Sequence, residues 1–337
     1  MSITEEKLNL LRQIIGGAPK KIALLSHTNP DGDTIGAALA WRSYLERLGH
    51  TTCCIAPNRY PYFLEWMTDI GHIGVFKEDH DGTMARFIGE ADVIFCMDFN
   101  QINRLDRVTD TVTANTTAVR VLIDHHLHPP VDGYAVQFSD THACSTSYIV
   151  YQLLEALAGI DQAMAESLYV GIMTDTGNFS FSSLTSDLFR AVAVLIDKGV
   201  NVPYVNSSVY NNFSEGRMRL LGYMLNDKMV TDYEFGVAYV SLTEEEMRRF
   251  DFIQGDSEGF VNYPLSIRGI RMSAMFIQTK HSIRVSLRSR GEVDVNVFAR
   301  RYFDGGGHRN AAGGKSYVPM NETLENFRKY LREYFGA

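Results

Sequence analysis

The chain contains few cysteines, and their spacing does not suit a metal-binding or redox motif. Only four occur among 337 residues, at Cys53, Cys54, Cys96 and Cys144. No two have the C-x-x-C spacing of a zinc knuckle or a thiol-redox pair, and all four lie in apolar contexts. We therefore predict buried free thiols and no zinc site built on cysteine.

Long apolar runs and an excess of positive charge are also missing. No window approaches the 18 or so apolar residues of a membrane span, and Met1–Lys7 lacks the pattern of a secretory signal. The formal net charge is −8, from 32 Lys and Arg against 40 Asp and Glu. These absences predict a soluble, cytoplasmic protein with no membrane partner. They argue against a protein that coats long nucleic acid, since such binding needs many basic contacts to phosphates, but leave open a small anion held at a metal.

A chain of 337 residues is longer than one typical hydrophobic core, which predicts two domains. Its first part alternates helices with strand candidates at 21–26, 51–56, 92–97 and 119–123. Helices are predicted at 187–198, 203–211 and 215–226, and strand-like alternation resumes at 235–240, 269–278 and 282–287. The predicted fold is therefore α/β, with a parallel-sheet domain over 1–190, a helical linker over 191–230 and a smaller C-terminal α/β domain over 231–337.

Asp124-His125-His126 follows an apolar, β-branched run, Val119–Ile123, that is typical of a buried parallel strand. The three polar residues should then lie at the C-terminal end of this strand, where sites form in open α/β sheets. His nitrogen together with Asp oxygen suits Mn²⁺, Fe²⁺ or Zn²⁺, whereas Mg²⁺ prefers an all-oxygen shell. A surface loop or helix cap with a chance histidine pair is the alternative for this triplet.

A second polar turn follows the strand candidate Lys21–Ser26 and precedes a helix. It carries His27, Asp31 and Asp33 within seven residues. Three potential ligands at this spacing favour metal binding. The alternative, an Asx turn with an N-cap aspartate, would explain Asp33 but not the other two residues.

Two further acids end elements in the same way. Asp98 follows the apolar strand at 92–97, and Asp175 follows a helix that starts near Asp161. Asp98 alone could be a strand-terminating cap, but five acids and two or three histidines from separate strand and helix ends could converge on one sheet edge and hold two metals. The histidines without this context are predicted to be surface or loop residues, and they are His50, His72, His80, His128, His142 and His281.

A glycine-rich segment near the C-terminus runs from Gly305 to Gly314 and includes His308. Three glycines before a histidine predict a backbone nest whose amide N–H groups approach an anion. A plain flexible hairpin is the alternative.

Together these motifs resemble those of the DHH phosphoesterase superfamily, which includes RecJ-like exonucleases. The resemblance rests on four successive stretches, His27-x-x-Pro30-Asp31-Gly-Asp33, Asp98, Asp124-His125-His126 and Thr174-Asp175-Thr-Gly177. The glycine-rich segment is similar to the signature of the DHH-associated C-terminal domain, Gly305-Gly306-Gly307-His308-x-x-Ala311-Ala312-Gly313. Motif order covers residues 22–314, and the length is most similar to the nanoRNase and pAp phosphatase branch.

The resemblance implies a site with two Mn²⁺ ions, with other divalent metals left open. One ion would be held by His27, Asp31 and Asp98, and the other by Asp33, Asp98, His125 and Asp175, so that Asp98 bridges them. In the catalytic pair, His126 would contact the scissile phosphate and Asp124 would orient its neighbours. The C-terminal domain would bind the nucleotide part of the substrate through Ser286, Arg288, Gly305, Gly306, Gly307 and His308.

The expected function is two-metal hydrolysis of short oligoribonucleotides (nanoRNA) and of 3′,5′-bisphosphorylated adenosine (pAp). Hydrolysis of a cyclic dinucleotide or its linear product is the alternative of the same chemistry. A catalytically inactive nucleotide-binding regulator is the alternative of another class, and the presence of every motif acid and histidine argues against it. An inorganic pyrophosphatase shares the N-terminal motifs, but its substrate has no base or ribose to recognise. The expected partners are short RNA and mononucleotide bisphosphates, and a homodimer stays open.

Overall fold

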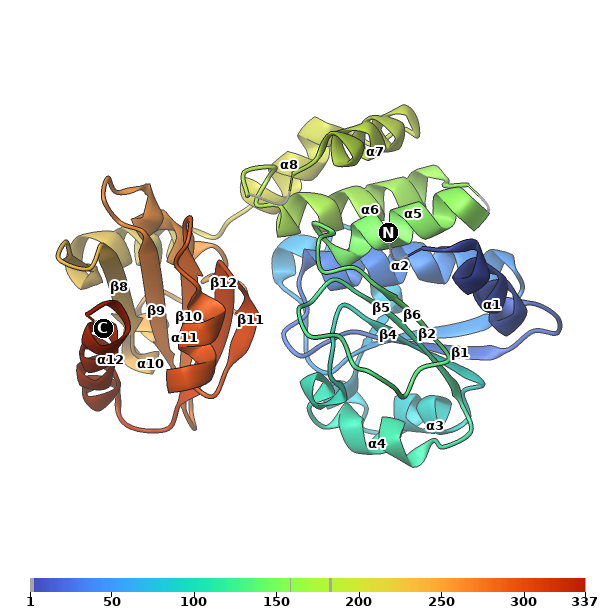
Figure 1. The fold of residues 1–337 in the computed structure, drawn as a ribbon, viewed down its shortest axis with the longest axis horizontal. Coiled ribbons are helices and arrows are strands. Elements are labelled where there is room, and N and C mark those ends of the chain that lie inside the picture. The colour runs from blue at the N-terminus through green and yellow to red at the C-terminus, as the bar shows by residue number, and fades with distance from the viewer. Residues whose placement is uncertain (1–2, 158, 182–183, 337) are drawn as a thin grey trace. The chain divides into compact units, whose positions relative to one another are not determined.

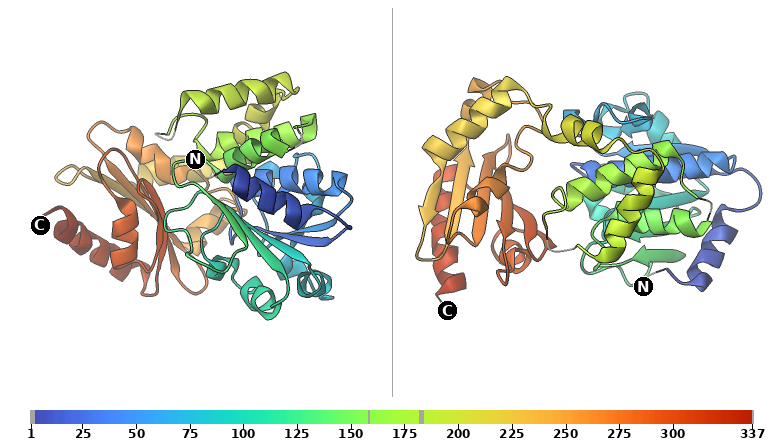
Figure 2. Two further views of the ribbon diagram at one scale, coloured as in Figure 1. Left: turned by 45° about the vertical axis from the view of Figure 1, so that its right-hand side comes forward. Right: turned by 90° about the horizontal axis from the view of Figure 1, so that it is seen from above.

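The computed structural model describes residues 3–157, 159–181 and 184–336, and the chain forms two compact units, Met1–Asn212 and Phe213–Ala337. This division falls inside the segment predicted as a helical linker, because its earlier helices pack into the core of the first unit and its last helix into the second. The predicted boundaries at 190 and 230 stay predictions. Figure 2 gives two further views of each unit. Among the described helices, none is both long and apolar enough to cross a membrane.

A six-stranded, all-parallel sheet forms the centre of the first unit (Figure 1). Its strands are β1 (Lys21–Leu25), β2 (Thr51–Ala56), β3 (Ile73–Val75), β4 (Val93–Met97), β5 (Val119–Asp124) and β6 (Val136–Ser139). They lie in the order β3-β2-β1-β4-β5-β6, so the winding direction reverses between β1 and β4. Ligands bind at such a switch point in open α/β sheets. The predicted parallel sheet is confirmed, although β3 and β6, with three and four residues, were not predicted.

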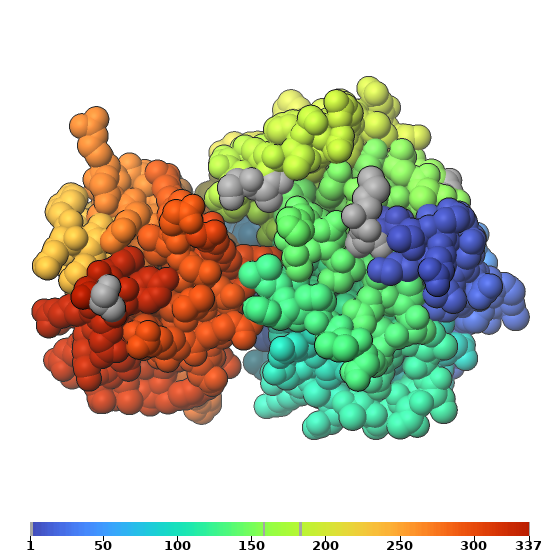
Figure 3. All heavy atoms as spheres, viewed as in Figure 1, coloured from blue at the N-terminus to red at the C-terminus, as the bar shows by residue number. Residues whose placement is uncertain are grey.

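Helices cover both faces of this sheet, because strand side chains point alternately to the two faces. Ile22 and Leu24 pack on the side of α2, α5 and α6, whereas Ala23 and Leu25 pack on the side of α3 and α4 (Figure 1). Helix α1 lies at the surface of this unit, in blue in Figure 3. The helices are α1 (Glu5–Ile15), α2 (Gly32–Arg47), α3 (Thr83–Gly89), α4 (Val108–Ala114), α5 (Thr146–Leu157), α6 (Gln162–Asp175), α7 (Ser186–Asp197) and α8 (Val202–Tyr210).

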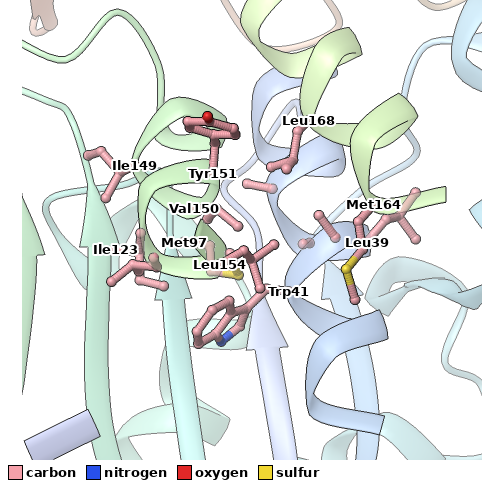
Figure 4. Close-up of a cluster of buried hydrophobic side chains, with 14 of the residues drawn as sticks. Leu39, Trp41, Met97, Ile123, Ile149, Val150, Tyr151, Leu154, Met164 and Leu168 are labelled. Atoms are coloured by element: carbon pink, nitrogen blue, oxygen red, sulfur yellow. The ribbon is translucent and has the colours of Figure 1, made fainter. Parts of the chain in front are cut away.

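Helix α2 is buried along most of its length and is held rigidly in the core. Trp41 is fully buried and packs edge-on against Phe95 of the sheet at 5.6 Å, and Figure 4 shows its surroundings beside Leu154. On the opposite side α2 approaches α6 so closely that a Cβ on Gly36 would lie 2.3 Å from the Ser167 carbonyl oxygen. Only glycine permits this approach. The N-terminal end of α2, which carries Asp31 and Asp33, therefore has a fixed position.

A second six-stranded sheet forms the centre of the second unit. Its order is β11-β12-β10-β9-β8-β7, and all pairs are antiparallel except β8 with β9. Helices α11 and α12 cover one face, and α9 and the 3₁₀ helix η6 cover the β8–β9 part of the other. The elements are α9 (Glu215–Tyr223), β7 (Val230–Asp232), β8 (Val237–Leu242), α10 (Glu244–Arg249), η6 (Phe260–Ser266), β9 (Met272–Gln278), β10 (Ile283–Ser289), α11 (Val295–Tyr302), β11 (Gly306–His308), β12 (Ala311–Ser316) and α12 (Met320–Phe335).

His50 lies in the loop between α2 and β2, as the prediction of a surface or loop residue allows, but it is buried there and supports the core. It is 6% exposed, its Nδ1 accepts a hydrogen bond from the Lys20 amide, and its Nε2 lies 2.8 Å from the Ile15 carbonyl oxygen. The ring thereby ties the end of α1 to the start of β1. The prediction of buried free thiols is confirmed for Cys54, Cys96 and Cys144. Cys53 is also free but only half-buried.

We expect the stability of the second unit to depend on pH because of Glu246 in α10. Its carboxylate accepts hydrogen bonds from Lys228, Tyr223 and the Thr243 amide at 2.6–2.8 Å. Burial alone raises the pKa of Glu246, but these bonds outweigh it and lower the pKa to about 2. Because the pKa is lower in the folded state than in the unfolded state, the stabilisation is complete at neutral pH. It is lost as the pH falls from the usual pKa of a glutamate toward 2.

We therefore expect Glu246→Gln to destabilise the second unit by about 1.5–3 kcal/mol at pH 7, the range for a hydrogen bond to a charged group. The difference from wild type should shrink below pH 4. Urea unfolding at pH 7, 4 and 3 measures it, with the exposed neighbour Glu245→Gln as the control. A difference between wild type and Glu246→Gln that does not change with pH would contradict this role of the carboxylate.

Candidate metal centre at the switch point

The predicted ligands of the first unit come together at the carboxyl ends of β1, β4 and β5. His27 follows β1, Asp98 follows β4, and Asp124 ends β5, directly before His125 and His126. The start of α2 supplies Asp31 and Asp33, and the last residue of α6 is Asp175. The side chains form overlapping groups whose ligand atoms lie within 4.8 Å of one another. The structure thus places all six predicted metal ligands at one end of the sheet.

The first group consists of His27, Asp31 and Asp98. His27 Nε2 lies 3.3 Å from Asp98 Oδ2 and 4.0 Å from Asp31 Oδ2. His27 Nδ1 lies 2.8 Å from the Thr28 carbonyl oxygen, so Nδ1 carries the proton. Burial, followed by the charge of Arg104, lowers the pKa of His27. In the neutral ring, an unprotonated Nε2 therefore faces two carboxylate oxygens.

The second group consists of Asp33, His125 and Asp175. His125 Nε2 lies 3.8 Å from Asp33 Oδ2 and 3.6 Å from Asp175 Oδ2. Burial lowers the pKa of His125, but the carboxylates of Asp175, Asp98 and Asp33 outweigh burial and raise it to about 9. The second group thus attracts a cation, which is a proton on His125 unless a metal replaces it.

Asp98 belongs to the first group, and its second oxygen approaches His125 of the second group. Oδ2 is the atom near His27, whereas Oδ1 lies 3.5 Å from His125 Nε2 and accepts a hydrogen bond from Thr146 Oγ1 at 2.9 Å. The residue is 2% exposed and has a left-handed backbone with φ +64°, which is uncommon for a residue other than glycine. Burial, then the charges of Asp33 and Asp31, raise the pKa of Asp98 well above its usual value.

Asp33 is held by the N-terminus of α5, a contact that the sequence analysis missed. The amides of Thr146 and Ser147 donate to Asp33 Oδ2 and Oδ1 at 2.7 and 2.8 Å. A helix N-terminus favours a carboxylate because its amides are unpaired and its dipole is positive. The stretch Ser145-Thr146-Ser147 was interpreted only as a cap, and Ser145 Oγ does accept from the Tyr148 amide. Nothing in the local sequence connects this cap to Asp33, which lies 114 residues before Ser147.

Asp31 is the N-cap residue of α2. The alternative considered from the sequence had assigned the N-cap to Asp33. Asp31 Oδ1 accepts from the amides of Asp33 and Thr34 at 3.1 and 3.2 Å. Its other oxygen, Oδ2, is the one directed to His27. Capping and membership of the first group are therefore compatible in one side chain.

Gly171 in α6 leaves the space that Ser147 occupies beside Asp33. A Cβ at this position would lie 1.9 Å from Ser147 Oγ and 3.1 Å from Asp33 Oδ1. We expect Gly171→Ala to destabilise the first unit by at least about 2 kcal/mol, in the upper range for overpacking, and to weaken metal binding by displacing Asp33. Thermal unfolding and metal titration measure both effects. Gly89→Ala is the control, since nothing lies within 4 Å of an added Cβ there. Unchanged metal affinity in Gly171→Ala would contradict the link to Asp33.

His126 lies between Asp124 and Arg104. Its Nδ1 is 2.8 Å from Asp124 Oδ1, and its Nε2 is 2.8 Å from Arg104 Nη1. Burial, then the charge of Arg104, hold the pKa of His126 well below its usual value. Arg104 was not predicted as a site residue, and it belongs to none of the motifs. It lies in a short 3₁₀ helix, Ile102–Leu105, after β4.

The predicted substrate residues of the second unit lie on neighbouring strands. Arg288 of β10, Ala311 of β12 and His308 of β11 are partners in one row across the sheet, and Ser286 is two residues before Arg288 on the same face. The glycine-rich segment forms a hairpin of β11 and β12. The Gly307 amide donates to Asn296 Oδ1 at 3.0 Å and is therefore already engaged. The glycines allow close strand contact, since a Cβ on Gly305 would lie 2.0 Å from the Gly313 carbonyl oxygen.

This fold, with acids and histidines at its switch point, defines a class of phosphoesterase. Residues 21–172 match the model of the DHH family, N-terminal domain, and residues 233–337 match that of the DHHA1 domain. The chain belongs to the DHH phosphoesterase family.

Relatives of this chain extend over nearly its whole length. It is 26% identical to the bifunctional oligoribonuclease and PAP phosphatase NrnA of Thermus thermophilus, over 97% of this chain and 94% of that protein. It is 28% identical to the protein of the same name from Bacillus subtilis, over 88% and 89% of the two chains. A crystal structure of an exopolyphosphatase-related protein from Bacteroides fragilis is 37% identical, covers 98% of this chain and 97% of its own, and superposes with a TM-score of 0.92.

Proposed function

We propose that this protein is a two-metal phosphoesterase that hydrolyses short oligoribonucleotides and pAp. The observation that carries the proposal is the position of Asp98, whose two oxygens face two separate groups of potential ligands. A bridging carboxylate of this kind is what a pair of ions needs for the in-line displacement of a phosphoryl group. The names of the two NrnA relatives support the substrates.

The donor atoms of these groups fit divalent metals. In the first group, the unprotonated His27 Nε2 faces carboxylate oxygens of Asp98 and Asp31, and three lone-pair acceptors in contact repel one another unless a cation lies among them. Ligand atoms about 2.0–2.2 Å from one ion are roughly 2.8–3.6 Å apart. The separations of 3.3–4.0 Å in the two groups are within or slightly above this range.

We assign one ion to His27, Asp31 and Asp98, and the other to Asp33, Asp98, His125 and Asp175. The mixture of nitrogen and oxygen donors suits Mn²⁺, as it also suits Fe²⁺ and Zn²⁺. When bound, the ions would supply an activated water and charge stabilisation at the phosphorus. Helix α5 would help to position the ions, because its N-terminal amides fix Asp33 and its Thr146 hydroxyl fixes Asp98.

In the second unit, we assign recognition of the nucleotide to Ser286, Arg288 and the hairpin Gly305-Gly306-Gly307-His308. A guanidinium pairs with phosphate through two parallel hydrogen bonds, and the row Arg288–Ala311–His308 places an arginine and a histidine on one sheet face with a small residue between them. The Gly307 amide already donates to Asn296, so it is one donor fewer for the predicted anion nest. The contribution of the glycines is steric.

The test of this function is a substrate panel followed by a length series. With Mn²⁺, we expect hydrolysis of pAp and of di- to pentaribonucleotides, and weaker or no hydrolysis of cyclic di-AMP and pyrophosphate. On 5′-labelled RNAs of two to about twenty-four nucleotides, the rate should fall with length, because the net charge of −8 disfavours long polyanions. The salt dependence should be shallow, since few phosphates are neutralised.

Other outcomes of this panel would favour other functions. A rate that rises with RNA length, or a steep salt dependence on long RNA, would favour a processive exonuclease. Preference for cyclic di-AMP would favour the cyclic-dinucleotide alternative. No hydrolysis of any substrate, together with nucleotide binding, would favour a regulator.

A further inference from the structure

Arg104 is anchored at both its backbone and its side chain beside the candidate metal centre. Its carbonyl oxygen accepts a hydrogen bond from the Thr28 amide at 2.8 Å, directly after His27. Its Nη1 lies 2.8 Å from His126 Nε2. These two contacts place Arg104 beside His27 and His126.

The contact with Arg104 determines which nitrogen of His126 carries the proton. An arginine guanidinium is always protonated in proteins, so Nη1 is the donor and His126 Nε2 is the acceptor. The proton of the neutral ring must then be on Nδ1, which donates it to Asp124 Oδ1 at 2.8 Å. Both ring nitrogens are engaged. Direct contact of His126 with a phosphate would require the Arg104 bond to break.

The guanidinium of Arg104 has few direct partners in the described part of the chain. No carboxylate of the described residues forms an ion pair with it within 4.0 Å, and the bond to His126 is the one hydrogen bond of its guanidinium there. A guanidinium has five N–H donors in a planar fork that matches two oxygens of a phosphate. A partly buried guanidinium of this kind, whose other N–H donors make no hydrogen bond among the described residues, suits an anionic ligand.

We propose that Arg104 binds the phosphate of the substrate and that His126 and Asp124 are positioning residues that hold its guanidinium. The proposal rests on the proposed function for the existence of a phosphate substrate. Asp124 orients His126, His126 accepts from Arg104, and Arg104 presents its remaining N–H groups. The direct phosphate contact expected of His126 is thereby transferred to Arg104.

The first experiment measures phosphate binding without turnover. Inorganic phosphate is titrated calorimetrically into the Mn²⁺-loaded full chain, as wild type, Arg104→Ala, Arg104→Lys and Arg107→Ala. We expect Arg104→Ala to weaken phosphate roughly tenfold to a hundredfold, the value of one charge-assisted hydrogen bond. Arg104→Lys should recover part of the loss, because a lysine keeps the charge but not the fork. Arg107→Ala, an exposed neighbour in the same segment, should bind as wild type does.

Metal content and thermal unfolding of each variant show whether it is folded and loaded. Phosphate affinity within twofold of wild type in a loaded Arg104→Ala variant would overturn the proposal. Phosphate binding can be measured even if the wild type hydrolyses none of the substrates of the panel. Failure of the proposed function and failure of the Arg104 proposal are therefore distinguishable.

The second experiment is a double-mutant cycle on pAp hydrolysis. If His126 acts through Arg104, His126→Ala should reduce kcat/KM in the wild-type background but by less than threefold when Arg104 is already alanine. Free guanidinium ion should restore part of the activity of Arg104→Ala and none of that of Asp98→Ala. Losses that multiply in the double variant, with no rescue by guanidinium, would show that His126 acts on the substrate itself and would overturn the positioning role.

Discussion

Replacement of Asp98 by alanine is expected to reduce kcat/KM on pAp by at least about a thousandfold. The variant loses one ligand from each proposed ion, because Asp98 Oδ2 faces His27 and Asp98 Oδ1 faces His125. Removal of several kcal/mol of charge stabilisation at the reacting phosphoryl group corresponds to a loss of this size. Steady-state kinetics with Mn²⁺ and metal analysis of the purified variant measure the two effects together.

Two variants serve as controls for Asp98→Ala. Asp110→Ala removes an exposed acid of α4 and should retain both metal and activity. His126→Ala should retain metal, since its nitrogens are engaged by Asp124 and Arg104. Normal turnover with two ions retained in Asp98→Ala would refute the bridge. Equal loss of metal from Asp98→Ala and His126→Ala would instead make His126 a ligand.

Arg288→Ala and His308→Ala are expected to reduce kcat/KM on pAp and dinucleotides roughly tenfold to a hundredfold. One charge-assisted hydrogen bond to phosphate is worth about 1.5–3 kcal/mol, which corresponds to this range. Hydrolysis of bis-p-nitrophenyl phosphate should change little, because this substrate has no nucleotide for the second unit to bind. Parallel kinetics on both substrates measure the difference.

The matched control for these variants is Arg290→Ala, which removes an exposed arginine two residues beyond Arg288. It should leave both substrates unaffected. If Arg288→Ala reduced hydrolysis of the generic substrate as strongly as that of pAp, the residue would take part in the chemistry, and its assignment to nucleotide recognition would be dropped.

The sequence by itself determined the parts of the site that depend on local pattern. A run of apolar, β-branched residues such as Val119–Ile123 must be buried, so the polar residues that end it lie at a sheet edge. The same reasoning placed His27 and Asp98 at strand ends. Parallel strands with helical crossovers bring such ends to one edge, and the predicted ligands therefore lie together without any knowledge of their contacts.

The tertiary structure alone decided how these residues are held. The α5 amides that bind Asp33, the Arg104 contact that sets the proton on His126, and the burial of His50 join residues far apart in sequence. Each of these residues has an ordinary local context, because serine and threonine cap many helices and arginine is common on surfaces. Their roles follow from packing, which places a polar group beside a partner only after the strands and helices have assembled.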